Sequence, residues 1–148
     1  TALIFPACKQ QPPVPQTGAK ISEAHDLWLT DFEAAQTKAR AEKKMVLMDF
    51  TGSDWCPPCK ILYQKVLSAQ EFLNYAKDNF VLVMVDLPMN KPQSEELTRA
   101  NKELLEKFEV EVFPTLVVLS SDGQQLIKEN GYDGSSAEDF VAKLKKLK

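Results

Sequence analysis

Hydrophobic residues follow two patterns along this chain: short continuous apolar runs, and runs in which an apolar residue recurs every three or four positions. The first pattern is typical of buried strands and the second of amphipathic helices. Strands are predicted at residues 45–51, 80–87, 115–119 and, after a turn at 121–123, 125–129. Helices are predicted at residues 30–43 with Thr30 as N-cap, from 58 onward, at 71–77 after a kink, at 94–108 with Ser94 as N-cap, and from 136 onward. The helix positions expected in the core are Phe32, Ala35, Ala39, Ile61, Leu62, Val66, Leu97, Leu104, Leu105, Phe108, Phe140, Val141 and Leu144.

The order of these elements predicts an α/β fold. The first two strands are joined through helices, so they should run parallel with a right-handed crossover. The last two strands should form an antiparallel hairpin at one edge of the sheet. The expected architecture is therefore a central mixed β-sheet flanked by helices on both faces.

The N-terminal segment differs in composition from the rest of the chain. Residues 1–8 are mostly apolar, and residues 9–18 are polar and proline-rich, which favours an extended tether. We interpret 1–19 as a leader remnant with a linker, and 20–148 as the folded domain. Cys8 ends the apolar stretch, where a lipoprotein signal carries its lipidated cysteine; a free cysteine is the equal alternative. Both interpretations fit export from a bacterial cytoplasm, and a lipid anchor at Cys8 would hold the protein at the membrane surface.

Composition narrows the classes of partner. The net charge of -3 gives no electrostatic reason to expect nucleic acid, and no apolar run is long enough for a membrane span. With 44% hydrophobic residues, the chain can build an ordinary core without disulfide staples. Three cysteines are too few for a disulfide-stapled secreted scaffold.

The candidate chemistry lies in the run Trp55-Cys56-Pro57-Pro58-Cys59, between a predicted strand and a predicted helix. Backbone N–H groups and the positive end of the helix dipole should favour the Cys56 thiolate, which can attack a disulfide in a partner. Cys59, one helical turn further on, is placed to resolve the mixed disulfide. Pro57 and Pro58 have no N–H, so the Cys59 amide is the expected local donor.

Three other interpretations of this cysteine pair compete with a redox role. A zinc site needs four ligands, and the only other candidates are Cys8 and His25, in or near the leader. A structural disulfide would close a ring too short to contribute much stability. An inactive domain of the same fold would not need both cysteines.

The motifs resemble the thioredoxin superfamily. The matching segments are residues 46–50, 55–60 and 113–115, and the run 50–56 is similar to exported bacterial proteins of the disulfide-reductase type. The resemblance implies that Pro114 is cis and packs beside the cysteine sulfurs. It implies that the Phe113 backbone pairs with an extended substrate segment, and that Trp55 borders the same groove. Gly131 and Tyr132 are weaker candidates for that groove, and ordinary packing is the preferred interpretation of Tyr132.

The resemblance also implies that Asp49 is a buried carboxylate that moves a proton to and from Cys59. Two departures bear on this role. The loop between Asp49 and Cys56 is one residue longer than in thioredoxin, and Met84 stands where thioredoxin has a lysine partner for this aspartate. The segment 87–112 is also longer and should affect partner choice. His25 is assigned no role. Asp54 could repel the Cys56 thiolate or only solvate its loop, and solvation is the preferred interpretation.

These observations predict a monomeric thiol–disulfide oxidoreductase that exchanges disulfides with proteins. Of the two net directions of exchange, reduction of the partner is the expected one. No metal or organic cofactor is expected. The expected location is the bacterial periplasm or cell envelope, with electrons from a membrane-linked donor. The sequence leaves two alternatives open: an adaptor that holds one cysteine-bearing client, such as an apocytochrome, and a net disulfide oxidant.

Overall fold

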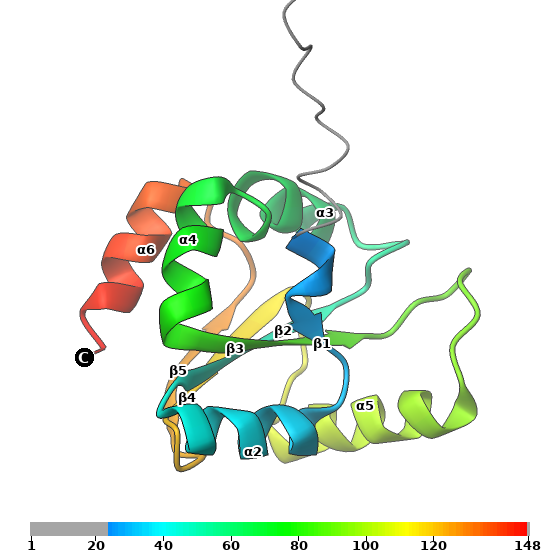
Figure 1. The fold of residues 1–148 in the computed structure, drawn as a ribbon. Coiled ribbons are helices and arrows are strands. Elements are labelled where there is room, and N and C mark those ends of the chain that lie inside the picture. The colour runs from blue at the N-terminus through cyan, green and yellow to red at the C-terminus, as the bar shows by residue number, and fades with distance from the viewer. Residues whose placement is uncertain (1–23, 148) are drawn as a thin grey trace, which may run out of the picture.

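The computed structural model describes residues 24–147 and contains a five-stranded mixed sheet between two layers of helices (Figure 1). The strands lie in the order β1-β3-β2-β4-β5. β1, β3 and β2 are mutually parallel, whereas β4 pairs antiparallel with β2 and with β5. The strands are β1 (Trp28–Leu29), β2 (Met45–Thr51), β3 (Phe80–Asp86), β4 (Thr115–Leu119) and β5 (Gln125–Asn130). The predicted mixed sheet with its terminal hairpin is therefore confirmed.

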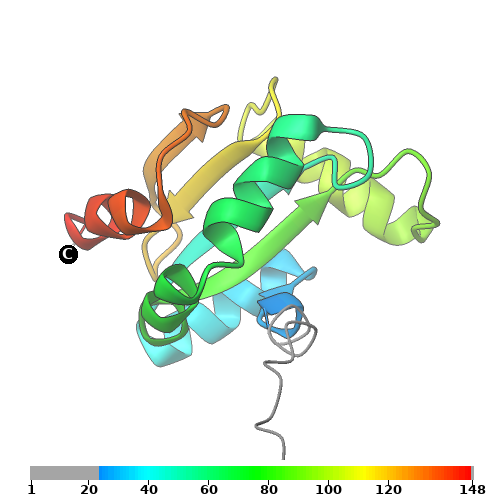
Figure 2. The ribbon, with the colours of Figure 1, turned by 90° about the horizontal axis from the view of Figure 1, so that it is seen from above.

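The helices divide between the two faces of the sheet (Figures 1 and 2). One face carries α3, α4 and α6, and the other carries α2 and α5. A π-helical turn, η1, links α3 to α4 and accounts for the kink expected from the sequence. The helices are α2 (Phe32–Glu42), α3 (Pro57–Leu62), η1 (Tyr63–Leu67), α4 (Gln70–Asn79), α5 (Glu95–Lys107) and α6 (Ala137–Lys145).

Alternation along the central strands assigns side chains to two separate cores. Leu47 and Leu82 face α3, α4 and α6, where Phe72 and Phe140 form an aromatic pair. Val46, Met48, Phe50, Val81, Val83 and Val85 face α2 and α5. Both central strands are thus covered on both faces, which explains why their sequences are continuously apolar.

Several local expectations were wrong in detail. Asp31, not Thr30, caps α2, because its carboxylate accepts the Ala34 N–H. Ile61 is 43% exposed and does not join the core. On α5, Leu104 is buried and Leu105 and Phe108 pack against the core as expected, whereas Leu97 does not join it and the polar Asn101 is buried instead. The predicted leader, residues 1–19, and Cys8 lie outside the described residues.

Candidate active site

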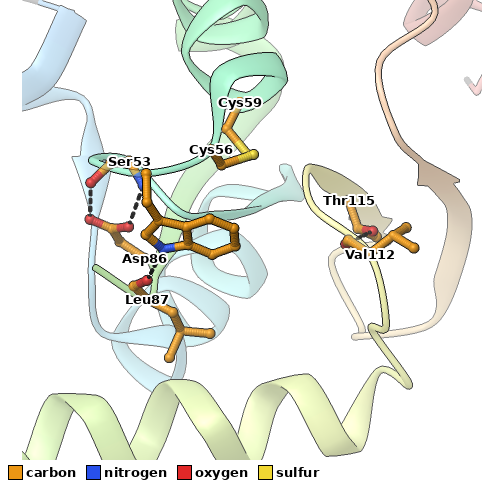
Figure 3. The surroundings of a disulfide bond; sticks show 8 residues. Ser53, Cys56, Cys59, Asp86, Leu87, Val112 and Thr115 are labelled. Carbon is orange, nitrogen blue, oxygen red and sulfur yellow. Dashed lines mark hydrogen bonds between the residues drawn. A yellow bond between two sulfur atoms is a disulfide. The ribbon is translucent and has the colours of Figure 1, made fainter. Parts of the chain in front are cut away.

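The cysteine pair lies where β2 gives way to α3 (Figure 3). Cys56 occupies the N-cap position of α3 with extended backbone dihedrals, and Cys59 lies within the first turn. The two form a disulfide with their Cα atoms 5.3 Å apart. The predicted juxtaposition of both sulfurs at a strand–helix junction is therefore what the structure shows.

Pro57 and Pro58 occupy the first two positions of α3, and both are exposed. Proline suits these positions because the first N–H groups of a helix have no intrahelical acceptor. The two prolines remove two of the free donors that a helix start would otherwise offer to the Cys56 sulfur. The Lys60 N–H already donates to the Cys56 carbonyl over 3.2 Å.

The disulfide is nearly covered, with Cys56 3% and Cys59 2% exposed. Its sulfurs point toward the loop that carries Val112 and Thr115 (Figure 3). In this loop the bond between Phe113 and Pro114 is cis, as the family resemblance implied. The Thr115 hydroxyl donates to the Val112 carbonyl over 2.7 Å and stabilises the bend. A partner therefore has a narrow approach to the sulfurs, bordered by this loop.

Trp55 is fixed beside the disulfide by contacts on three sides. Its indole N–H donates to the Leu87 carbonyl over 2.8 Å, and its ring meets the Phe113 ring edge-on with centroids 5.6 Å apart. A Cβ added at Gly52 would lie 2.2 Å from Trp55 Cε2, so the indole packs directly on this glycine. Trp55 is nevertheless 38% exposed and offers an apolar surface next to Cys56.

Asp49 lies on β2 beneath the disulfide and is 2% exposed. Burial, and secondarily the negative charge of Asp86, raises the pKa of Asp49 from 3.8 to about 7. Asp49 Oδ1 has no hydrogen-bond partner within the part of the chain that the structure describes. Met84 lies opposite Asp49 in the register between β2 and β3, so the β3 position paired with this carboxylate carries an apolar side chain.

A cavity of about 320 Å³ connects Asp49 with Cys59. It is lined by His25, Asp49, Thr51, Ser53, Cys59, Lys60, Tyr63, Gln64, Met84, Asp86 and Lys91. Burial and the nearby Asp49 charge also raise the pKa of Tyr63. A proton leaving Cys59 can therefore meet a carboxylate with a pKa suited to neutral pH, which is what general acid–base catalysis requires.

Asp54 has a structural role that the sequence did not indicate. Its carboxylate accepts backbone N–H groups of Met89, Asn90 and Lys91 at 2.7–3.0 Å. These bonds hold the pKa of Asp54 below its usual value. The expectation that Asp54 only solvates its loop is wrong, because the side chain joins the active-site loop to the segment that follows β3.

Other residues of the site were also missed. Ser53 donates its N–H and its hydroxyl to the Asp86 carboxylate over 2.9 and 2.5 Å (Figure 3). His25, assigned no role from the sequence, lines the cavity of Asp49. Only the register between β2 and β3 brings Asp86 to the site, so the local sequence around Asp86 gives no signal of it.

Residues 24–147 contain no cluster of three or more His, Cys, Asp or Glu side chains that could hold a metal ion. Over the same residues, no helix has the length and apolar character needed to cross a membrane. The substrate-binding roles of Trp55, Phe113 and Pro114, and the proton-transfer role of Asp49, stay predictions. Tyr132 is half-buried, and its hydroxyl donates to the Ser135 carbonyl.

Comparison with known proteins agrees with this geometry. Residues 32–148 match the model of the thioredoxin-like domain. The chain is 32% identical over 125 residues to the disulfide bond reductase DsbH of Chlamydia pneumoniae, covering 84% of this chain and 74% of that protein. It is 33% identical over 115 residues to an H-type thioredoxin of rice, Oryza sativa subsp. indica, covering 76% and 79%.

Among solved structures, a DsbH oxidoreductase superposes with a TM-score of 0.75 at 30% identity, covering 81% of this chain and 82% of that one. Partners of such proteins are substrates with disulfides or thiols, because the reactive group is itself a dithiol–disulfide pair. The chain therefore belongs to the thioredoxin-like family and is a thiol–disulfide oxidoreductase whose redox centre is the Cys56–Cys59 pair.

Proposed function

We propose that this protein reduces disulfide bonds in other proteins, with Cys56 as the attacking thiolate and Cys59 as the resolving thiol. The observation that carries the proposal is the disulfide at the start of α3, with a buried carboxylate, Asp49, reaching the cavity behind Cys59. The similarity to a disulfide bond reductase favours reduction over oxidation as the net direction.

The reaction consists of two exchanges. The Cys56 thiolate attacks a substrate disulfide, forms a mixed disulfide and releases one substrate thiolate. Cys59 then loses its proton to Asp49 and attacks Cys56 Sγ, which re-forms the Cys56–Cys59 bond and releases the second substrate thiolate. Both substrate sulfurs take up protons, and the two electrons that they gain come from the reduced enzyme dithiol, which is oxidised to the Cys56–Cys59 disulfide.

The direct test is insulin-type disulfide reduction by the wild type and by Cys56→Ser. The variant should lose activity, because without the Cys56 thiolate no mixed disulfide forms. Cys8→Ser is the matched control and should retain full activity. Activity that persists in Cys56→Ser would overturn the mechanism.

Direction is decided by the reduction potential of the Cys56–Cys59 pair in glutathione buffers. A value of about -270 mV is expected for a reductant, and a value of about -120 mV would identify an oxidant.

Trapping with Cys59→Ala shows how many different proteins the enzyme acts on, since this variant cannot resolve its mixed disulfides. Many trapped proteins are expected; a single dominant one would identify a dedicated adaptor.

We also propose that the protein works in the bacterial periplasm or cell envelope and receives electrons from a membrane-linked donor. The support is the leader-like composition of residues 1–19 and the resemblance of residues 50–56 to exported proteins. Fractionation of cells that express the full gene tests the location, and Cys8→Ser tests the lipid anchor. Recovery in the cytosol would refute export, and unchanged membrane association of Cys8→Ser would refute the anchor.

A further inference from the structure

Two carboxylates lie on the same face of the central strands. Asp49 pairs in register with Met84, and Thr51 pairs with Asp86. Because side chains alternate between faces, residues 49 and 51 of β2 share one face with residues 84 and 86 of β3. This is the face covered by α3, which carries Cys59. Asp86 thus lies one pleat further along the neighbouring strand from Asp49.

Both carboxylates line the 320 Å³ cavity that also includes Cys59. Asp49 is at the buried end, and its Oδ1 has no hydrogen-bond partner among the described residues. The side chain of Asp86 is 20% exposed and so lies nearer to solvent. The cavity therefore leads from the resolving sulfur, past one carboxylate, to a second.

Asp86 is held firmly in this place. Its carboxylate accepts the N–H and the hydroxyl of Ser53, and its backbone carbonyl accepts the side-chain amides of Gln93 and Asn101. Asn101 is 1% exposed, so this part of β3 is fixed by a buried contact with α5. Lys91 lies 4.0 Å from the carboxylate, but its side chain is 56% exposed and its charge is screened by solvent.

We propose that Asp86 is a positioning residue for the exchange reaction: its fixed negative charge strengthens Asp49 as the base that takes the proton of Cys59. The proposal rests on the reductase function proposed above. During resolution the Cys59 S–H bond breaks, its proton moves to Asp49, and its electron pair forms the bond to Cys56. The substrate thiolate leaves with the electron pair of the mixed disulfide. Asp49 then releases the proton to solvent along the cavity, past Asp86.

The charge environment of Asp49 supports this assignment. Besides Cys59, which is held in the disulfide, the cavity is lined by the ionisable side chains of His25, Lys60, Tyr63, Asp86 and Lys91. Of these, only Asp86 contributes a resolved charge effect on Asp49, and it acts in the same direction as burial. In place of a lysine that would favour the charged carboxylate, this chain has Met84 and a second acid. Asp49 is therefore a stronger base than it would be beside a lysine. A strong base is needed because the buried Cys59 thiol is a weak acid.

The test is a titration of the Asp49 side-chain carboxyl by ¹³C NMR in the oxidised protein, which requires no substrate. Asp86→Asn removes the negative charge of residue 86. The asparagine amide can still accept the Ser53 N–H and can still hydrogen-bond with the Ser53 hydroxyl. We expect the Asp49 midpoint to fall in this variant and to return toward the wild-type value in Asp86→Glu. Ser53→Ala removes a hydrogen bond and keeps both charges, so its midpoint should match the wild type.

The same effect should appear in the kinetics. When kcat/KM for insulin reduction is measured against pH, its rise on the acidic side should occur at lower pH in Asp86→Asn than in the wild type. If the midpoint falls from about 7 to about 6, activity at pH 6 relative to its plateau rises about fivefold. An unchanged NMR midpoint in Asp86→Asn would overturn the proposal, as would an equal fall in Ser53→Ala. Loss of insulin reduction by the wild type would instead refute the reductase function and leave the titration result intact.

Discussion

The buried carboxylate of Asp49 should make the stability of the oxidised protein depend on pH. Its pKa is 3.8 in an unfolded chain and about 7 in the fold. Between these values the native state binds the proton that the unfolded state has released, so stability falls as pH rises. An interval of about three pH units, at 1.36 kcal/mol each, gives a loss of about 4 kcal/mol. Above pH 7 both states are ionised and the loss stays constant.

The perturbation that isolates this effect is Asp49→Asn. The amide keeps the shape of the carboxyl, and Oδ1 has no hydrogen bond to lose among the described residues. At pH 8 the variant should therefore be more stable than the wild type by up to about 4 kcal/mol. At pH 4 the native carboxyl is protonated, so the difference should nearly vanish.

Urea unfolding of the oxidised protein at pH 4, 6 and 8 measures both free energies. Glu33→Gln, on the exposed side of α2, is the matched control and should follow the wild type at each pH. Contributions from other carboxylates such as Asp54 are common to the wild type and Asp49→Asn and cancel in the difference. Equal stabilities of these two proteins at pH 8, or a gap that stays the same at pH 4, would refute the reasoning.

Three further predictions concern the surroundings of the disulfide. Gly52→Ala would place its Cβ against Trp55; the displaced indole should change tryptophan fluorescence and raise KM for insulin, at a cost of about 1–3 kcal/mol in unfolding free energy. Unchanged fluorescence would contradict the close contact. Asp54→Ala removes the acceptor of three backbone N–H groups, so amides of residues 89–91 should exchange faster with D₂O, while those of β4 serve as the control. Thr115→Val removes the hydroxyl that donates to the Val112 carbonyl and should cost about 0.5–1.5 kcal/mol in urea unfolding; a neutral result would count against that hydrogen bond.

The sequence predicted the fold well wherever the pattern was long and local. The strands 45–51 and 115–119 were predicted with their observed bounds, and Ser94 caps its helix as expected. β1 was missed because two residues are too few to show alternation. Ile61 was misassigned because periodicity gives the face of a helix, but not how much of that face the neighbouring elements cover.

For the active site, the cysteine pair and the cis proline were predictable because their motif is contiguous or specific. Asp86 was not, because its approach to Asp49 depends on the pairing of two strands whose register the sequence does not state. The role of Asp54 was also hidden, since its three donors come from a loop more than thirty residues away. Interactions that depend on the meeting of distant loops leave no local signal in a single sequence.

The joined loops also have a consequence for how such a protein can diversify. Asp54 and Trp55 attach the rim of the redox centre to residues 87–91, and Lys91 of this segment also lines the cavity of Asp49 and Cys59. Changes in the length or composition of this segment would alter the surroundings of Trp55 and, through Lys91, the cavity of Asp49 as well. The entrance to the disulfide and the surroundings of its buried carboxylate are therefore tied to one short stretch of chain, so neither can be remodelled there without touching the other.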